Sequence, residues 1–173
     1  TSGGAIYIER DDYNSSDIVI ISESILSGNS STGERGGAIS NIRGNLVIRN
    51  SQIESSQVIG GYNESPKGGE IYSLGGNLDI RDTDFIASEF STFPGDHLHS
   101  YGGAVYIEND PLWSGDRGLD HHVYNAVYSG FTADFGGAFY TQEPTSFENV
   151  LMVGNTALNK GGAVYSDGHK AQM

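Results

Sequence analysis

A short pattern of two glycines followed by alternating small, apolar and polar positions recurs along the chain. Successive copies begin 25 to 34 residues apart. Repetition at such a period is typical of stacked architectures, in which each unit buries its apolar face against the units above and below it. The six copies read GGAIYI, GGAISN, GGEIYS, GGAVYI, GGAFYT and GGAVYS, and they begin at Gly3, Gly36, Gly68, Gly102, Gly136 and Gly161.

Further apolar runs in each unit alternate with a period of two, which predicts β-strands. One strand follows the glycine pair, a second includes residues 18–20, 46–48 and 78–80, and a third apolar position lies beyond a polar corner. Three short strands separated by corners describe one coil of a right-handed parallel β-helix. The sequence therefore predicts an all-β solenoid of about six coils. The predicted corners are Ser22, Asn50 and Asp82, and the third apolar positions are Ile25, Ile53 and Phe85.

The domain organisation follows from the repeat. We expect residues 1–173 to form a single β-helix segment. A solenoid needs polar capping layers at its ends, and neither end of the sequence has the features of such a cap. We therefore expect this segment to be part of a longer chain, or its ends to stack on other subunits.

Glu70 stands where the other five units have Ala, and it indicates which way the strand side chains point. An unpaired buried carboxylate is very costly, so this column is predicted to face solvent and the next column to face the core. The tyrosine column then faces outward, as a strip that binds another surface, although simple stacking of like side chains also explains it. The predicted core column is Ile6, Ile39, Ile71, Val105, Phe139 and Val164, and the predicted binding residues are Tyr7, Tyr72, Tyr106, Tyr140 and Tyr165.

Composition restricts the class of function. With 9 basic and 22 acidic residues, the chain has a formal net charge of −13, which disfavours nucleic acid or an anionic membrane as a partner. No run of about 20 apolar residues is present, so we expect no membrane span in this segment. The lack of Cys excludes disulfides, thiol nucleophiles and Cys-ligated metals.

Acidic side chains in the first and fourth units are the candidates for catalysis. Glycoside hydrolysis needs two carboxyl groups about 5 to 9.5 Å apart, and a β-helix would present them at a shared offset on neighbouring layers. No such recurrence is found, so we interpret the acids as solvated surface and predict no catalytic residue and no cofactor. The residues considered are Asp11, Asp12, Asp110, Asp116, Asp120, His121 and His122.

A calcium site in the fourth unit is an alternative use of these acids, because Ca²⁺ prefers oxygen ligands. His121 and His122 cannot share one ion if they lie on a strand, since neighbours point to opposite faces. No specific metal site is predicted. The oxygen-bearing residues are Glu108, Asn109, Asp110, Asp116 and Asp120.

Three sequons begin at Asn14, Asn29 and Asn63. They are glycan acceptors only if the source is eukaryotic and the chain is secreted. All three fall in predicted loops or corners, where a glycan has room.

The repeated phrase and a short element before it resemble a known family. GGA followed by Ile, Val or Phe occurs in five of the six units, and Glu70 replaces the Ala in the other. Leu26–Asn29 and Met152–Asn155 resemble an FxxN motif with another apolar residue in place of Phe. Together these motifs resemble the passenger repeats of chlamydial polymorphic outer membrane proteins. The resemblance implies a β-helical adhesin that is exported by an autotransporter barrel.

A β-helix alone does not determine function, because adhesins, fibres, polysaccharide lyases and glycoside hydrolases share it. We expect a non-enzymatic structural or adhesive β-helix of a cell-surface protein, located outside the cell. Its partner would be a protein surface, from a neighbouring subunit or a host receptor, or a glycan. A segment of an extracellular filament, including a homopolymer, is the alternative, and a fragment of a carbohydrate-active enzyme is a third hypothesis.

Overall fold

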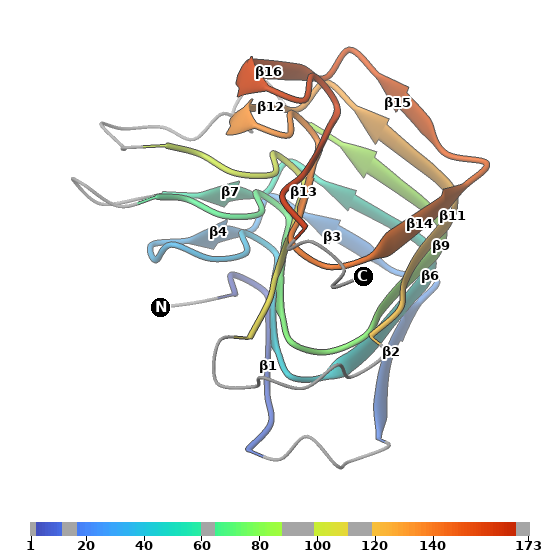
Figure 1. The fold of residues 1–173 in the computed structure, drawn as a ribbon. Coiled ribbons are helices and arrows are strands. Elements are labelled where there is room, and N and C mark those ends of the chain that lie inside the picture. The colour runs from blue at the N-terminus through green and yellow to red at the C-terminus, as the bar shows by residue number, and fades with distance from the viewer. Residues whose placement is uncertain (1–2, 12–16, 60–64, 88–98, 111–118, 169–173) are drawn as a thin grey trace, which may run out of the picture.

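The computed structural model describes residues 3–11, 17–59, 65–87, 99–110 and 119–168, and every regular element in these ranges is a β-strand (Figure 1). The prediction of an all-β protein is confirmed. The strands are β1 (Ile6–Glu9), β2 (Ile18–Ser22), β3 (Ile25–Ser27), β4 (Ser30–Ser31), β5 (Ile39–Ile42), β6 (Asn45–Glu54), β7 (Gln57–Val58), β8 (Ile71–Leu74), β9 (Leu78–Ile86), β10 (Val105–Glu108), β11 (His121–Ser129), β12 (Thr132–Phe135), β13 (Phe139–Thr141), β14 (Thr145–Glu148), β15 (Leu151–Val153), β16 (Thr156–Lys160) and β17 (Val164–Ser166).

The strands that follow the glycine pairs form one parallel sheet of six strands. Its order, β1-β5-β8-β10-β13-β17, is the order of the units in the sequence, so each unit pairs with the units before and after it. Ile39 lies beside Ile6 on one side and beside Ile71 on the other, and the register continues to Val164. The predicted core column is confirmed, because its four middle residues are fully buried and its two end residues pack against the same core.

The three longest strands of a second parallel sheet, β6, β9 and β11, each bend at one residue. The order of its main path is β14-β11-β9-β6-β2. The bends lie at Asn50, Asp82 and Asn125, whose φ angles are 48°, 47° and 49°. Asn and Asp tolerate this left-handed conformation better than most residues, and Nδ2 of Asn125 donates to Oδ1 of Asp82 at 3.0 Å. The corners predicted at Asn50 and Asp82 are confirmed, whereas Glu23 takes the place of Ser22 in the first unit.

The first unit is one residue out of the predicted register. Val19 rather than Ile18 pairs with Leu46, and Leu26 rather than Ile25 occupies the inward position beyond the corner. Because side chains alternate along a strand, a slip of one residue exchanges the two faces. Ile25 is consequently 71% exposed, and Leu26 packs against the core in its place.

The glycine pair is required by the turn that leads into each strand of the first sheet. Gly36 has a φ of 52°, a conformation that residues with a side chain rarely adopt. A Cβ atom on Gly37 would lie 2.1 Å from the carbonyl oxygen of Gly69 in the next unit. The first glycine therefore allows the turn, and the second allows neighbouring units to approach each other closely.

The main hydrophobic core contains inward side chains of both large sheets. Ile39 and Ile71 come from the first sheet, and Ile48, Ile80 and Phe85 come from the second. Two small parallel sheets, β4-β7 and β12-β16, complete the described units. In Figure 1 the colours pass from blue to red as equivalent strands succeed one another along the stack. Parallel pairing of equivalent strands is consistent with the β-helix that the sequence predicts.

Candidate functional site

The tyrosine column is in register but is not an exposed strip. Tyr72, Tyr106 and Tyr140 are neighbours on adjacent strands, and their exposed fractions are 0%, 3% and 4%. The prediction of an exterior strip is therefore wrong for these three residues. Tyr165 is half-buried. Tyr7, on the outermost described strand of the sheet, is 51% exposed.

A second column of side chains covers the tyrosines. It consists of the residue before each glycine pair, and parallel bridges connect Arg35, Lys67, Tyr101 and Phe135 in that order. The guanidinium of Arg35 lies 4.8 Å from the ring centroid of Tyr72, and Nζ of Lys67 lies 5.3 Å from that of Tyr106, which are cation–π contacts. The sequence contains a signal for this cover, because the position before the glycine pair is basic or aromatic in five of the six units.

Carboxylates accept hydrogen bonds from two of the buried phenols. The Tyr72 hydroxyl donates to Glu108, and the Tyr140 hydroxyl donates to Asp167 at 2.9 Å. Burial is the largest cause that raises the pKa of Tyr72, Tyr106 and Tyr140, because the phenolate would lose its hydration, and nearby carboxylates raise it further. The rings of Tyr106 and Tyr140 stack with centroids 4.8 Å apart. The column is thus a second intramolecular core of neutral, stacked rings.

Glu70 is fully buried, contrary to the prediction that its column faces solvent. The N–H groups of Glu70 and Ile71 both donate to the carbonyl oxygen of Ala104, each at 2.9 Å. When two consecutive residues donate to one acceptor, the alternation of side chains is interrupted. The column of Glu70 and the column of Ile71 therefore both face the core. Oε1 of Glu70 accepts from the N–H of Ser56 at 3.0 Å, and burial raises the pKa of the carboxyl to about 7. The column also includes the fully buried Ala38, Ala104 and Ala138.

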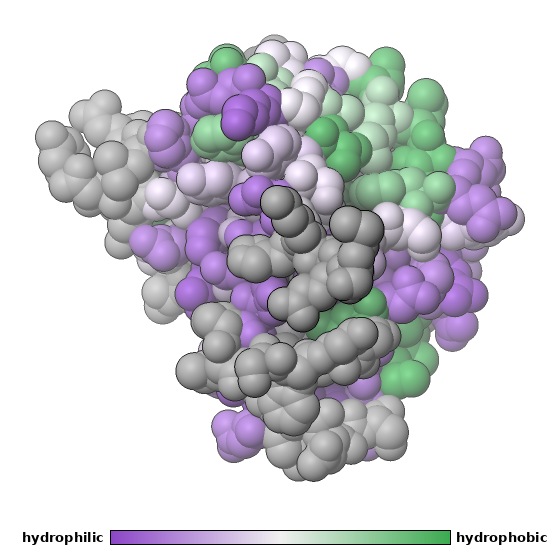
Figure 2. All heavy atoms as spheres, viewed as in Figure 1, coloured by the Kyte–Doolittle hydropathy of each residue, from purple (hydrophilic) through white to green (hydrophobic). Residues whose placement is uncertain are grey.

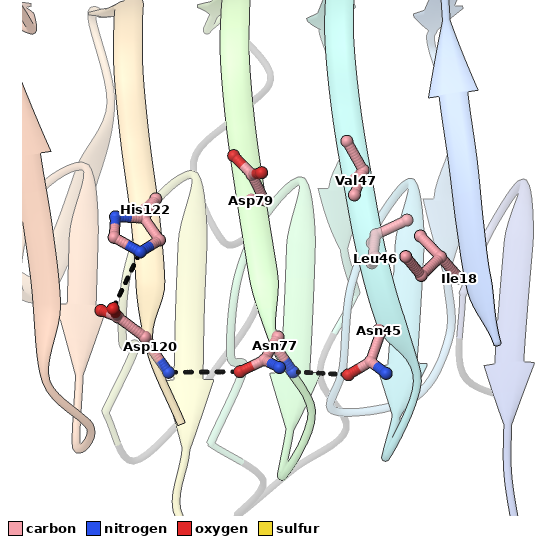
Figure 3. A pocket seen from close by; sticks show the side chains of 8 residues that line it. All are labelled: Ile18, Asn45, Leu46, Val47, Asn77, Asp79, Asp120 and His122. Carbon is pink, nitrogen blue, oxygen red and sulfur yellow. Dashed lines mark hydrogen bonds and ion pairs between the residues drawn. The ribbon is translucent and has the colours of Figure 1, made fainter. Parts of the chain in front are cut away.

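A groove crosses the outer face of the second sheet (Figure 3). Its volume is about 450 Å³, which lies within the range of small-ligand sites. Four successive units contribute to it, through β2, β6, β9, β11 and the residues just before them. The lining residues are Ile18, Asn45, Leu46, Val47, Asn77, Asp79, Asp120 and His122. Sequence reasoning considered Asp120 and His122 but did not connect them with the residues of the earlier units.

Hydrogen bonds between successive units order the polar side chains of the groove. The N–H of Asn77 donates to Oδ1 of Asn45 at 3.4 Å, and the N–H of Asp120 donates to Oδ1 of Asn77 at 3.2 Å. Oδ2 of Asp120 lies 2.9 Å from Nε2 of His122. Figure 3 shows these contacts in a row that crosses neighbouring strands. The groove therefore presents polar groups whose positions are fixed by the backbone of the stack.

His122 also contacts Ser146, which produces a serine–histidine–aspartate arrangement. Oγ of Ser146 lies 2.7 Å from Nδ1 of His122, whose Nε2 faces Asp120. A nucleophile, a base and an orienting acid within hydrogen-bond reach are the components of covalent catalysis. However, the side chains of His122 and Asp120 are 50% and 66% exposed, and Ser146 is exposed as well. All three groups are open to solvent, whereas reactive nucleophiles of this kind act in dry, preorganised surroundings.

Two of the acids considered for calcium form ion pairs. Oδ2 of Asp110 lies 2.8 Å from Nε of Arg43, and Oε1 of Glu108 lies 3.0 Å from Nζ of Lys67. Asp12 and Asp116 lie outside the described residues. Within the ranges that the structure describes, no group of three His, Cys, Asp or Glu side chains could hold a metal ion.

The two adjacent histidines begin β11 and point to opposite faces, as the sequence predicts for residues on a strand. His121 is 1% exposed, whereas His122 lies on the outer face. Nδ1 of His121 accepts from the N–H of Leu78 at 3.2 Å, and burial lowers the pKa of His121 to about 4. The two rings are therefore not placed to bind one ion.

The sequons at Asn14 and Asn63 lie outside the described residues, and Asn29 is in a poor position to carry a glycan. Nδ2 of Asn29 is buried. Asn155, at the equivalent place in the second FxxN-like element, bridges two units. Its Oδ1 accepts from the N–H of Phe131 at 3.0 Å, and its Nδ2 donates to the carbonyl oxygen of Tyr128 at 2.9 Å. We interpret the Asn of this motif as a structural turn residue.

A comparison with known protein families finds a match near the end of the described residues. The matched segment contains β15, the turn at Asn155, β16 and the glycine pair at Gly161. Residues 149–167 match the Chlamydia polymorphic membrane protein repeat. The resemblance that the sequence predicts is confirmed by this segment. This repeat occurs in surface proteins of the Chlamydia outer membrane. No curated protein and no solved structure matches the chain. Among the described residues, no helix has the length and apolar character needed to cross a bilayer.

Proposed function

We propose that the chain is a segment of a right-handed parallel β-helix that serves as the shaft or adhesive surface of an extracellular, cell-surface protein, without catalytic activity. The match of residues 149–167 to a repeat of outer-membrane surface proteins carries this proposal. The same glycine-pair phrase, strand and parallel register occur in the preceding units. This continuity supports extending the interpretation from the matched segment to the rest of the stack.

Apolar side chains on the outer surface support a role in contacting other surfaces. Figure 2 shows hydrophobic residues along the side of the molecule that the second sheet occupies. Exposed apolar groups that gather on one face are typical of interaction surfaces. The exposed aliphatic residues of this sheet include Ile18, Ile20, Ile25, Leu151 and Val153, with exposed fractions of 57%, 53%, 71%, 59% and 49%.

Attachment of coated beads to surfaces tests the adhesive role. Beads that carry the full 173-residue chain are expected to attach saturably to cultured cells, to matrix proteins or to a glycan array. Beads that carry the heat-denatured chain are the control, because they present the same composition without the stack. The adhesive role would be contradicted if the folded chain attached to none of these surfaces.

The absence of catalysis is tested separately. Incubation with acidic and neutral polysaccharides, with and without Ca²⁺, should release no reducing or unsaturated sugar ends. Turnover that disappears in the variant Asp120→Asn would refute the non-enzymatic assignment.

A segment of an extracellular filament is the second candidate. Ile25 on β3 and Leu158 on β16 are 71% and 69% exposed, and they lie on outermost strands at the two ends of the described stack. A head-to-tail contact between copies would bury such residues and produce an open fibre. Sedimentation and electron microscopy distinguish the two, because a filament segment grows into longer particles with concentration and an adhesive segment stays monomeric.

A further inference from the structure

The groove on the second sheet changes in character along its length (Figure 3). At the β2 and β6 end its wall is aliphatic and includes Ile18 and Val47. At the β9 and β11 end it contains the carboxylates of Asp79 and Asp120 and the imidazole of His122. Val47, Asp79 and His122 are register partners on three neighbouring strands. Since adjacent strands lie about 4.8 Å apart, Val47 and His122 are separated by about 10 Å.

The two carboxylates of the acidic end differ in their partners. Arg81 donates to both oxygens of Asp79, from Nε at 2.8 Å and from Nη2 at 2.6 Å, and its positive charge compensates that carboxylate. Asp120 contacts His122, which is charged only if protonated. Among the residues that line the groove, none supplies Asp120 with a permanent positive charge. Its side chain is 66% exposed and so is accessible to a ligand.

We propose that this groove holds an extended segment of a partner protein, an inference that rests on the proposed adhesive function. A Lys or Arg of the segment contacts Asp120, and an aliphatic side chain packs against Ile18 and Val47. The net charge of −13 attracts such a cationic segment at long range. Charge complementarity then fixes its direction in the groove. The amide groups of Asn45 and Asn77 also line the groove and offer hydrogen bonds to the backbone of the segment.

The length of the groove determines the spacing of the two anchoring residues. An extended peptide advances about 3.3 Å per residue and places alternate side chains on one face, so residues two or four positions apart are separated by about 7 or 13 Å. The flexible stem of Lys or Arg adjusts either distance to the groove. A neutral glycan would use the amide row but would leave the charge of Asp120 unmatched, and for this reason a cationic peptide is favoured.

A fluorescein-labelled peptide, Gly-Ser-Leu-Ser-Arg-Ser-Gly, titrated with the full chain by fluorescence anisotropy, tests this proposal. Affinity should fall about 5-fold in Asp120→Asn, as for loss of one exposed ion pair, and about 10-fold in Ile18→Ser, through loss of apolar contact. Asp84→Asn is the matched control, because Asp84 is an exposed carboxylate of β9 outside the groove. Its affinity should equal that of the unaltered chain. Binding should also weaken at 0.5 M salt, because salt screens exposed charges.

Three results would overturn the proposal. They are no saturable binding to the folded chain, equal binding of a peptide with Glu in place of Arg, and unaltered affinity in Asp120→Asn. Binding of a neutral oligosaccharide that depends on Asp120, with no binding of the peptide, would assign the groove to a glycan instead. A chain that attaches to cells but does not bind the peptide refutes the groove assignment alone. A chain that binds the peptide but attaches to nothing refutes the adhesive role alone.

Discussion

The backbone N–H of Ser56 donates a 3.0 Å hydrogen bond to Oε1 of Glu70, whose side chain is fully buried. Oε2 of the same carboxyl is buried and has no hydrogen-bond partner among the described residues. Burial disfavours the charged carboxylate and raises its pKa to about 7. The folded chain therefore retains a proton that the unfolded chain releases near pH 4.5, which makes stability dependent on pH.

Glu70→Gln should leave stability near the wild-type value at pH 4.5 and raise it at pH 8. Because the folded pKa is above the unfolded one, the stabilising contribution of the protonated carboxyl is complete below pH 4.5 and is lost as pH rises through 7. Gln keeps an acceptor for Ser56 and cannot ionise. Urea denaturation should give a gain of about 1 to 3 kcal/mol at pH 8. The same change in unfolding free energy at both pH values would argue against the titration of Glu70.

His121→Leu should remove a loss of stability that occurs in acid. The folded pKa of His121, about 4, is below its usual 6.5, so the stability that the neutral ring provides is present above pH 6.5 and declines as pH falls toward 4. Leu already occupies this inward column at Leu46 and Leu78 in the preceding units. Thermal denaturation between pH 4 and 7 should show a variant whose advantage over wild type increases toward acid. A constant difference across this range would refute the assignment.

Tyr106→Ser together with Tyr140→Ser should lower stability by several kcal/mol, since each truncation of a buried aromatic ring costs about 3 kcal/mol or more. Ser40 occupies the same column in the second unit, so the backbone accepts Ser there. Tyr7→Ser is the matched control, because Tyr7 is largely exposed. Thermal denaturation measures the melting temperatures of the double variant and of Tyr7→Ser. An unaltered melting temperature in the double variant would mean that the tyrosine column is not a packed core.

Ile71→Asp and Ile25→Asp introduce the same charge at one position that faces the core and at one that faces solvent. Ile71 is fully buried, so an unpaired carboxylate there should cost several kcal/mol or prevent folding. Ile25 is 71% exposed, and its substitution should change the unfolding free energy by no more than about 0.5 kcal/mol. Chemical denaturation measures both. Comparable losses in the two variants would contradict the inward and outward assignments.

The repeat phrase predicts the first sheet well, because glycine pairs at a fixed offset impose one register on every unit. Ile6 pairs with Ile39, and Tyr106 pairs with Tyr140, as the alignment of the phrases indicates. The second sheet is harder to predict in the first unit, where Ile18 and Val19 are both aliphatic. Composition does not reveal which of two adjacent apolar residues faces inward, and pairing with the next strand decides it.

The site depends on contacts between units, which a single unit does not reveal. The sequence places Glu70 at the surface because an unpaired buried carboxylate is costly, whereas in the structure the N–H of Ser56 donates to it and burial raises its pKa to about 7. Tyr106 is predicted to face solvent because it alternates with the inward column of Ile71, whereas in the structure Lys67 covers its ring. The groove is harder to predict than either column, because the stacking of four units brings together its two ends at Ile18 and His122.

Disulfide cross-linking between units tests the stacked parallel arrangement most directly, because the chain has no Cys of its own. Gln52 and Asp84 are register partners on β6 and β9, and a strand spacing of about 4.8 Å suits a disulfide. Val127 is the partner of Asp84 on the far side, two spacings or about 10 Å from Gln52. We predict that Gln52→Cys with Asp84→Cys forms an intramolecular disulfide under mild oxidation and that Gln52→Cys with Val127→Cys does not. Cross-linking of the second pair without the first, detected by mass spectrometry, would contradict the stack.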